Sequence, residues 1–171
     1  MTIVENKTSN YTNYVPIALP ILYLGIASPK RLREVYKAAM TLGLIFQARD
    51  DFLDVYGDPR ITGKIGTDIQ ENKCSWLPVT PLEYSNDEQK KLLETCYGTE
   101  KNSDIVKVKV KALFDHLDLA EKSRRWDERV MGEARALFQG SSDAGLKEVF
   151  TLFLSKYLQD PRRGVPRPAK L

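Results

Sequence analysis

Three aspartates, Asp50, Asp51 and Asp54, have the side-chain type and the spacing of a metal site. If their segment is helical, Asp50 and Asp54 project from the same face, and Asp51 lies about 100° round the helix from Asp50. Hard cations such as Mg²⁺ take oxygen ligands and usually bridge a carboxylate to a phosphate. A solvated helix end whose carboxylates only face water has the same pattern. Because the acids follow the apolar segment 42–46, which has the character of a core, the sequence favours a Mg²⁺ site.

Lysines near the acids in sequence could hold a phosphate beside such a metal. Lys64 lies between Gly63 and Gly66, and could approach a phosphate without obstruction by neighbouring side chains. The segment is not a Walker loop, because the G-x-x-x-x-G-K-[ST] spacing is absent. A turn with an exposed lysine is the alternative interpretation. Lys7 and Lys73 could add positive charge to the same site, although each is also compatible with a solvated lysine.

Composition argues against other classes of site. The 26 lysines and arginines exceed the 23 acids by only three, which is too small an excess to indicate a nucleic-acid partner. Cys74 and Cys96 lack a C-x-x-C spacing and His116 is the only histidine, so a Cys/His zinc site is not supported. Both cysteines are expected to be reduced and structural.

The acids belong to an expected long helix. From Arg31 to Phe46 apolar residues recur at spacings of three and four, which predicts a helix. Ser28-Pro29 should separate the preceding segment from this helix, and Gly57-Asp58-Pro59 should end the helix. An earlier helix is expected to begin with Thr8 or Ser9 as its cap.

Further helices are expected after the acids. Asp68 could cap a helix from Ile69, which Pro78 and Pro81 should interrupt early. Its buried side is expected to hold Cys74, Trp76 and Leu77. Amphipathic patterns predict four more helices over 85–97, 104–119, 120–138 and 144–158. Asn86 or Ser85 is expected to cap the first of these. The alternation at 106–110 could suggest a strand, but the flanking apolar spacing is helical, so the predicted fold class is all-α.

The two ends of the chain carry little structural signal. No secretory signal is evident, and the apolar run 14–27 is too short and too rich in proline and glycine to be a transmembrane segment. The Pro- and Arg-rich tail 159–171 is expected to be irregular. A cytoplasmic protein is expected, with the weak peroxisomal address Ala169-Lys170-Leu171 as an alternative.

Several runs taken together resemble one family, the farnesyl diphosphate synthases among the polyprenyl synthases. The first of these runs are Lys7-Thr8, Tyr11, Tyr14-Val15-Pro16, 46–54 and 57–59. The others are 63–70, 72–77, Tyr97-Gly98, 110–113 and 117–119. The resemblance is most specific between Phe46 and Leu77.

The resemblance implies an isoprenoid-synthase-type helical bundle around a deep cavity, usually in a homodimer. In this family two aspartate-rich motifs hold Mg²⁺ ions that bind an allylic diphosphate. The second motif would be formed here by Asp50, Asp51 and Asp54, with Asp68 acting on the metal indirectly, through a direct ligand or through a water molecule. The diphosphate would be held by Lys7, Lys64 and Lys73. Thr8 and Gln47 would lie beside the allylic cation, and Phe46 beside isopentenyl diphosphate. Lys7, Thr8, Gln47 and Lys64 are therefore the candidate catalytic residues.

The family's first aspartate-rich motif and its arginines for isopentenyl diphosphate are missing from the sequence. Residues 1–158 are therefore expected to be the C-terminal half of the prenyltransferase domain. The implied reaction condenses dimethylallyl or geranyl diphosphate with isopentenyl diphosphate. The chain would form a homodimer or pair with a full-length subunit. The alternative is a truncated, non-catalytic paralogue or interaction module. A terpene cyclase would need the same metal motif, but the runs 63–68 and 72–76 favour chain elongation.

Overall fold

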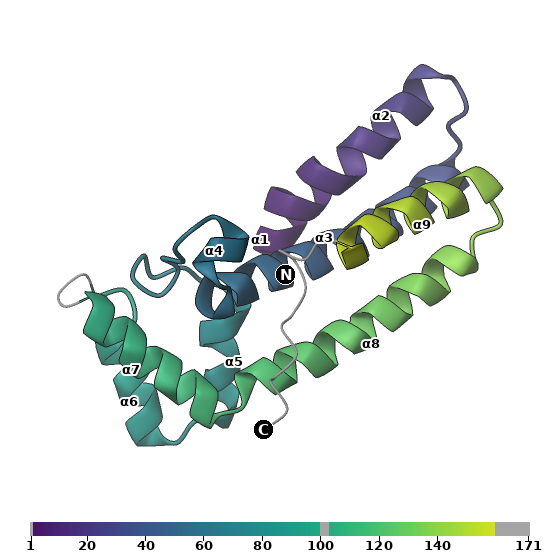
Figure 1. Ribbon diagram of the computed structural model, residues 1–171. Helices are drawn as coiled ribbons and strands as arrows, with labels where there is room; N and C mark the ends of the chain where they lie inside the picture. The colour runs from purple at the N-terminus through teal and green to yellow at the C-terminus, as the bar shows by residue number, and fades with distance from the viewer. Residues whose placement is uncertain (1, 100–102, 160–171) are drawn as a thin grey trace. The chain divides into compact units, whose positions relative to one another are not determined.

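The computed structural model describes residues 2–99 and 103–159, and it is helical throughout its regular elements (Figure 1). The elements are α1 (Thr2–Val4), the π-helix η1 (Glu5–Tyr14), α2 (Val15–Tyr23), α3 (Pro29–Tyr56) and α4 (Pro59–Thr62). They continue with α5 (Trp76–Tyr84), α6 (Asp87–Cys96), α7 (Ser103–His116), α8 (Leu119–Gln139) and α9 (Ala144–Gln159). The described residues contain no strand, which confirms the all-α class and places 106–110 in α7.

The chain divides into two compact units. Among the described residues, unit 1 consists of 2–47 and 126–159, and unit 2 consists of 48–99 and 103–125. The division falls inside α3, after Gln47, and inside α8, after Arg125. The predicted irregular tail and the Ala169-Lys170-Leu171 address lie outside the described residues, so both stay predictions.

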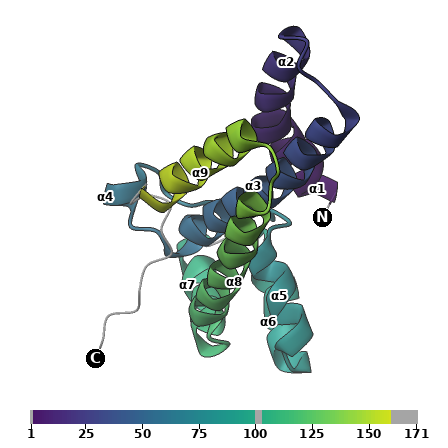
Figure 2. The same ribbon diagram turned by 90° about the vertical axis from the view of Figure 1, so that its right-hand side faces the viewer.

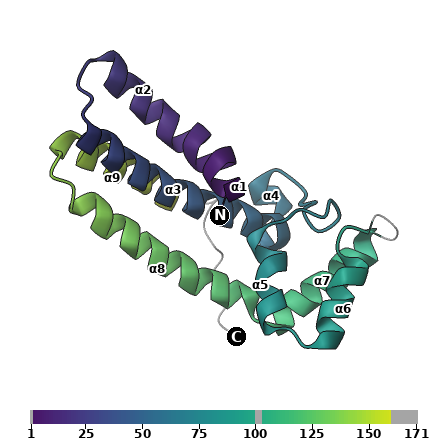
Figure 3. The same ribbon diagram turned by 180° about the vertical axis from the view of Figure 1, so that it is seen from behind.

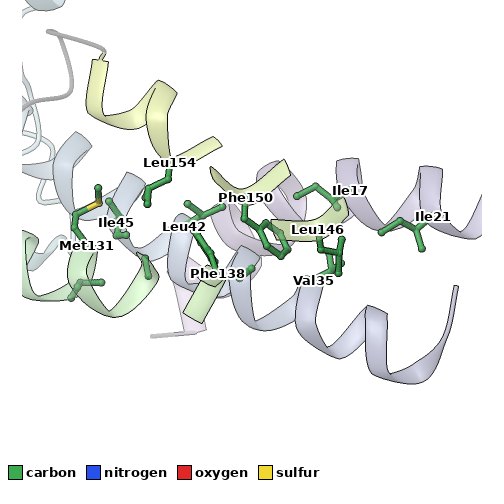
Figure 4. Close-up of a cluster of buried hydrophobic side chains, with 13 residues drawn as sticks. Ile17, Ile21, Val35, Leu42, Ile45, Met131, Phe138, Leu146, Phe150 and Leu154 are labelled. Atoms are coloured by element: carbon green, nitrogen blue, oxygen red, sulfur yellow. The ribbon is translucent and has the colours of Figure 1, made fainter. Parts of the chain in front are cut away.

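The core of unit 1 is built from the apolar faces of four helices. Figure 4 shows side chains of α2, α3, α8 and α9 that meet in one cluster. Phe138 and Phe150 stack within it, with their ring centroids 5.0 Å apart. Leu42 of α3 is fully buried among them. The three- and four-residue spacing that predicted α3 therefore reflects a real buried face.

The core of unit 2 is a second, separate cluster. Figure 3 shows α6 alongside α7, and the cluster includes Ile69, Leu77, Val110 and Phe114. Asn86 begins α6 with a capping box: its side chain accepts the Gln89 N–H, and the Gln89 side chain accepts the Asn86 N–H. Such reciprocal capping satisfies backbone donors that the helix itself leaves unpaired. Of the two caps expected from the sequence, Ser85 and Asn86, the structure has Asn86.

The limits of α3 agree with the sequence. The loop that leaves α2 and returns as α3 is visible in Figure 2. The Ser28 hydroxyl accepts the Arg31 N–H over 3.1 Å, and Pro29 is the first residue of the helix. Proline suits that position because its missing N–H would be unpaired there in any case. At the other end, Gly57 and Pro59 separate α3 from α4 as expected.

The helix cap expected at Thr8 or Ser9 is wrong. Both residues lie buried inside η1, which begins at Glu5. The Asn13 side-chain amide donates to the Thr8 carbonyl over 3.3 Å in this segment. The hydroxyls of Thr8 and Ser9 bond to α3 rather than to their own helix start, and long-range contacts of this kind are absent from local sequence patterns.

The helix expected from Ile69 is also wrong. Residues 68–72 form turns, and α5 begins only at Trp76. Cys74 is exposed rather than buried, although the cysteines are free as expected. Pro78 falls in the first turn of α5, where the backbone N–H groups have no helical partner, so it does not interrupt the helix. Pro81 is tolerated one turn later, where it is buried.

None of the described helices has the length and apolar character needed to cross a membrane. This agrees with the absence of a transmembrane segment in the sequence analysis.

Candidate diphosphate and metal site

The three aspartates of the motif lie in the last two turns of α3 and have different environments. The Asp50 side chain is 48% exposed. Asp51 is buried, and its Oδ2 accepts the Trp76 N–H over 3.1 Å. Asp54 is half-buried, and its Oδ1 accepts the Asp68 N–H over 2.8 Å. The motif therefore contains one accessible carboxylate and two that also organise the backbone of unit 2.

The loop of residues 63–68, which we call the site loop, packs against the acids of α3. The Lys64 Nζ lies 3.0 Å from Asp50 Oδ1. The backbone of Gly66 lies so close to the Asp54 carbonyl that a Cβ atom there would collide with it. The two glycines thus have different roles. Gly66 permits this close approach, whereas Gly63 ends α4 with φ at 73°, in the left-handed region that favours glycine.

A second lysine pairs with the acid at the end of the site loop. The Lys73 Nζ lies 3.2 Å from Asp68 Oδ1 and 3.0 Å from Glu71 Oε2. The hydrogen bond to Glu71, and then the one to Asp68, raise the pKa of Lys73 above its ordinary value. Two lysines expected to hold a diphosphate, Lys64 and Lys73, are therefore paired with two acids expected to hold a metal.

The acids of unit 2 repel one another electrostatically. Burial raises the pKa of Asp68 above its ordinary value, and the charge of Asp54 raises it further. Lys73 opposes this increase, and Asp50 adds a smaller contribution in the same direction as Asp54. Three carboxylates are thus close enough to interact, and a bound cation would relieve their repulsion.

The residues fit a Mg²⁺ ion shared with a diphosphate better than a metal held by protein alone. Within 2–99 and 103–159, no group of three or more His, Cys, Asp or Glu side chains forms a ready ligand set. Mg²⁺ commonly uses one or two carboxylates together with substrate phosphates and water. Asp50, Asp54 and Asp68 supply only oxygen atoms, the donors that this ion prefers.

The remaining candidate residues belong to unit 1. The Thr8 hydroxyl donates to the Gln47 side-chain oxygen over 2.7 Å, so the structure brings these two predicted residues together. Gly43 allows η1 to lie close to α3, because a Cβ there would collide with Ser9. Lys7 is exposed and Phe46 is half-buried.

The residues that hold the segment 69–73 have no signal in the local sequence. The Tyr97 hydroxyl donates to the Lys73 carbonyl over 2.8 Å, and the Gly98 N–H donates to the Ile69 carbonyl over 2.8 Å. Gly98 has φ at 75°, and a Cβ there would collide with Asn72. Tyr97-Gly98 was part of the resemblance, but nothing local indicated its partners.

Known proteins include relatives of this chain. Residues 1–114 match the family model described as polyprenyl synthetase. The farnesyl pyrophosphate synthase of Schizosaccharomyces pombe is 41% identical over 156 residues, which cover 90% of this chain and 44% of the relative. The Homo sapiens farnesyl pyrophosphate synthase is 40% identical over 138 residues, 81% of this chain and 32% of the relative.

Solved structures give the same result. Unliganded T. brucei FPPS is 27% identical, with a TM-score of 0.81, and the match covers 90% of this chain and 47% of that one. A complex of T. brucei FPPS with 2-(5-chlorobenzo[b]thiophen-3-yl)acetic acid has a TM-score of 0.82 at 26% identity. The chain thus spans less than half the length of these relatives.

Proposed function

This chain belongs to the polyprenyl synthetase family, and we propose that it acts in prenyl transfer of the farnesyl diphosphate synthase type. The substrates would be isopentenyl diphosphate and an allylic diphosphate, either dimethylallyl or geranyl diphosphate. The proposed cofactor is Mg²⁺. The names of the relatives support this choice of substrates, and the oxygen-only donor set of unit 2 supports the metal.

One observation carries the proposal: two lysines are paired with carboxylates of the same acidic cluster. Lys64 pairs with Asp50, and Lys73 pairs with Asp68. The Lys64–Asp50 pair is half-exposed, and exposed pairs of this kind contribute only about 0–1 kcal/mol. Such a pair separates at little cost. Each lysine could then donate to a diphosphate oxygen while its former partner turns to the metal.

The proposed reaction begins when the allylic C–O bond breaks and its electron pair leaves with pyrophosphate. Lys64 and Lys73 would stabilise that charge by donating to its oxygens, and bound Mg²⁺ would neutralise it further. Thr8 fixes the Gln47 side-chain oxygen by a hydrogen bond, and this oxygen would face the allylic cation. The isopentenyl double bond then attacks the cation, a C–C bond forms and a proton is lost. Lys7 would bind the diphosphate, and Phe46 would contact isopentenyl diphosphate.

The test is turnover by the purified chain with Mg²⁺, isopentenyl diphosphate and geranyl diphosphate. An Asp50→Ala variant should lose product formation, because the accessible acid of the motif is removed. Glu94→Ala, an exposed acid on α6, is the matched control and should keep wild-type turnover. Turnover that persists in Asp50→Ala would contradict the proposed role of the motif.

A second candidate is a non-catalytic module that binds Mg²⁺ and diphosphate and needs a partner chain for catalysis. One observation favours it: α2 exposes apolar side chains, with Leu19 59% and Leu22 51% exposed, as a surface covered by a partner would. Under this candidate the chain shows no turnover alone but binds inorganic pyrophosphate in a Mg²⁺-dependent way, and Asp50→Ala abolishes the binding.

A further inference from the structure

Lys107 of α7 forms a hydrogen bond to the site loop, from which it is far apart in sequence. Its Nζ donates to the Gly66 carbonyl oxygen over 2.6 Å, across 41 residues. Lys107 is half-buried, and Gly66 is buried. Gly66 is also the residue whose backbone packs on the Asp54 carbonyl. One residue of the loop therefore contacts both α3 and α7.

Gly66 lies in the chain between the two residues of the site loop that contact the acids Asp50 and Asp54. Two residues before it, Lys64 pairs with Asp50. Two residues after it, the Asp68 N–H donates to Asp54. A displacement of Gly66 would therefore change the positions of Lys64 and Asp68 together.

The other lysines of α7 have different environments. Lys111 pairs with Asp115 and lies over the Tyr56 ring, 4.7 Å from its centroid. Lys109 is exposed. The bond from Lys107 is short, partly buried and donated by a charged group, which is the stronger class of hydrogen bond.

We propose that Lys107 is a positioning residue for the metal and diphosphate site. Its ammonium group binds neither the metal nor the diphosphate. It holds the Gly66 carbonyl, so that Asp54, Asp68 and Lys64 keep the arrangement in which they bind. This inference rests on the proposed function for the identity of the ligand. The hydrogen bond from Lys107 to the Gly66 carbonyl does not depend on that ligand.

The test compares Lys107→Met, Lys107→Arg and the control Lys109→Met in the full chain. Methionine keeps much of the apolar stem but removes the donor, whereas arginine keeps a charged donor. Calorimetry measures the affinity for inorganic pyrophosphate with MgCl₂. Hydrogen exchange without ligand measures the protection of the Asp68 amide, relative to the Val110 amide in the core of the same unit.

We expect Lys107→Met to weaken pyrophosphate binding at least about tenfold, as is typical when a group that orients metal ligands is removed. Asp68 exchange should increase selectively, Lys107→Arg should keep most of the affinity, and Lys109→Met should match the wild type. The proposal would be overturned if Lys107→Met bound pyrophosphate as tightly as the wild type. It would also be overturned if exchange increased equally at the Asp68 and Val110 amides. If the wild type binds no pyrophosphate, the proposed function fails, and hydrogen exchange alone tests the role of Lys107. A selective increase in exchange at Asp68 in Lys107→Met then supports the positioning role of the Lys107–Gly66 hydrogen bond. The absence of such an increase overturns it.

Discussion

At the scale of single residues, the acids of the candidate site hold the site loop by hydrogen bonds and also repel one another by their charges. Asp54 and Asp68 organise the site loop, yet their negative charges lie close enough to raise the pKa of Asp68. Asp51 is buried as well, and it accepts the Trp76 N–H at the start of α5. The acids proposed to bind Mg²⁺ therefore repel one another in the ligand-free chain. The free chain should lose stability where these acids ionise.

Asp68→Asn should stabilise the ligand-free chain at neutral pH. Burial, and then the charge of Asp54, raise the pKa of Asp68, so the folded state binds its proton more tightly than the unfolded state. The free energy of unfolding of the wild type should therefore fall as pH rises from the ordinary pKa of 3.8 through the raised value. The variant should lack this part of the decrease.

Urea unfolding of both proteins between about pH 3.5 and 7 measures this difference. The advantage of the variant should grow over the interval and then stay constant. An advantage that is absent at pH 7, or that shrinks as pH rises, would contradict the assignment. With MgCl₂ and pyrophosphate the order should reverse, because the variant has lost a proposed ligand.

At the scale of elements, η1 reaches α3 because Gly43 carries no side chain. Ser9 lies where a Cβ of residue 43 would be, and the Ser9 hydroxyl donates to the Met40 carbonyl over 3.4 Å. One residue earlier in η1, Thr8 contacts Gln47. π-Helical segments are rare and are often found at functional sites. Here the π-helix places two predicted catalytic residues in contact.

Gly43→Ala should destabilise the chain by about 1–3 kcal/mol, because the added methyl group overpacks a tight contact. The matched control is Gly132→Ala in α8 of the same unit, where no atom lies within 4 Å of the new Cβ. This control should stabilise the chain by about 0.5–1 kcal/mol, since alanine is the better helix former. Urea unfolding followed by circular dichroism measures both. Equal effects of the two substitutions would contradict the packing argument.

At the scale of the whole molecule, each of the two units has its own apolar cluster. Every predicted metal ligand and both paired lysines belong to unit 2, whereas Thr8, Gln47, Phe46 and Lys7 belong to unit 1. The residues with proposed roles are therefore divided between the two units. Each group of residues depends on the core of its own unit, and the two cores can be tested separately.

Phe150→Ala should lower the free energy of unfolding by about 3–5 kcal/mol, the usual cost of removing a buried aromatic ring. Phe150 is 1% exposed and stacks on Phe138. Leu152→Ala on the same helix is the control, because Leu152 is 58% exposed, and it should change stability by less than about 0.5 kcal/mol. Chemical denaturation of both variants provides the measurement. A loss of under about 1 kcal/mol for Phe150→Ala would contradict the role of this cluster in the core.

The sequence by itself determined the helical class and the limits of α3, narrowed the cap of α6 to Ser85 or Asn86, and predicted the acids and lysines of the candidate site. These features depend on local causes: apolar periodicity, glycine and proline at helix ends, and the charge of the side chains. It predicted the start of α5 wrongly, because the Trp76 N–H is bonded by Asp51, 25 residues earlier.

Only the tertiary structure decided which groups meet. Asp54 bonds the Asp68 amide, Thr8 bonds Gln47, and Lys107 bonds Gly66 at separations of 14, 39 and 41 residues. No local pattern encodes such pairs, because they form only when the burial of apolar surface brings distant segments together. The same reason explains the two glycines beside Lys64. The sequence showed that both lack side chains, and the fold showed that Gly63 ends a helix while Gly66 lets the site loop reach Asp54.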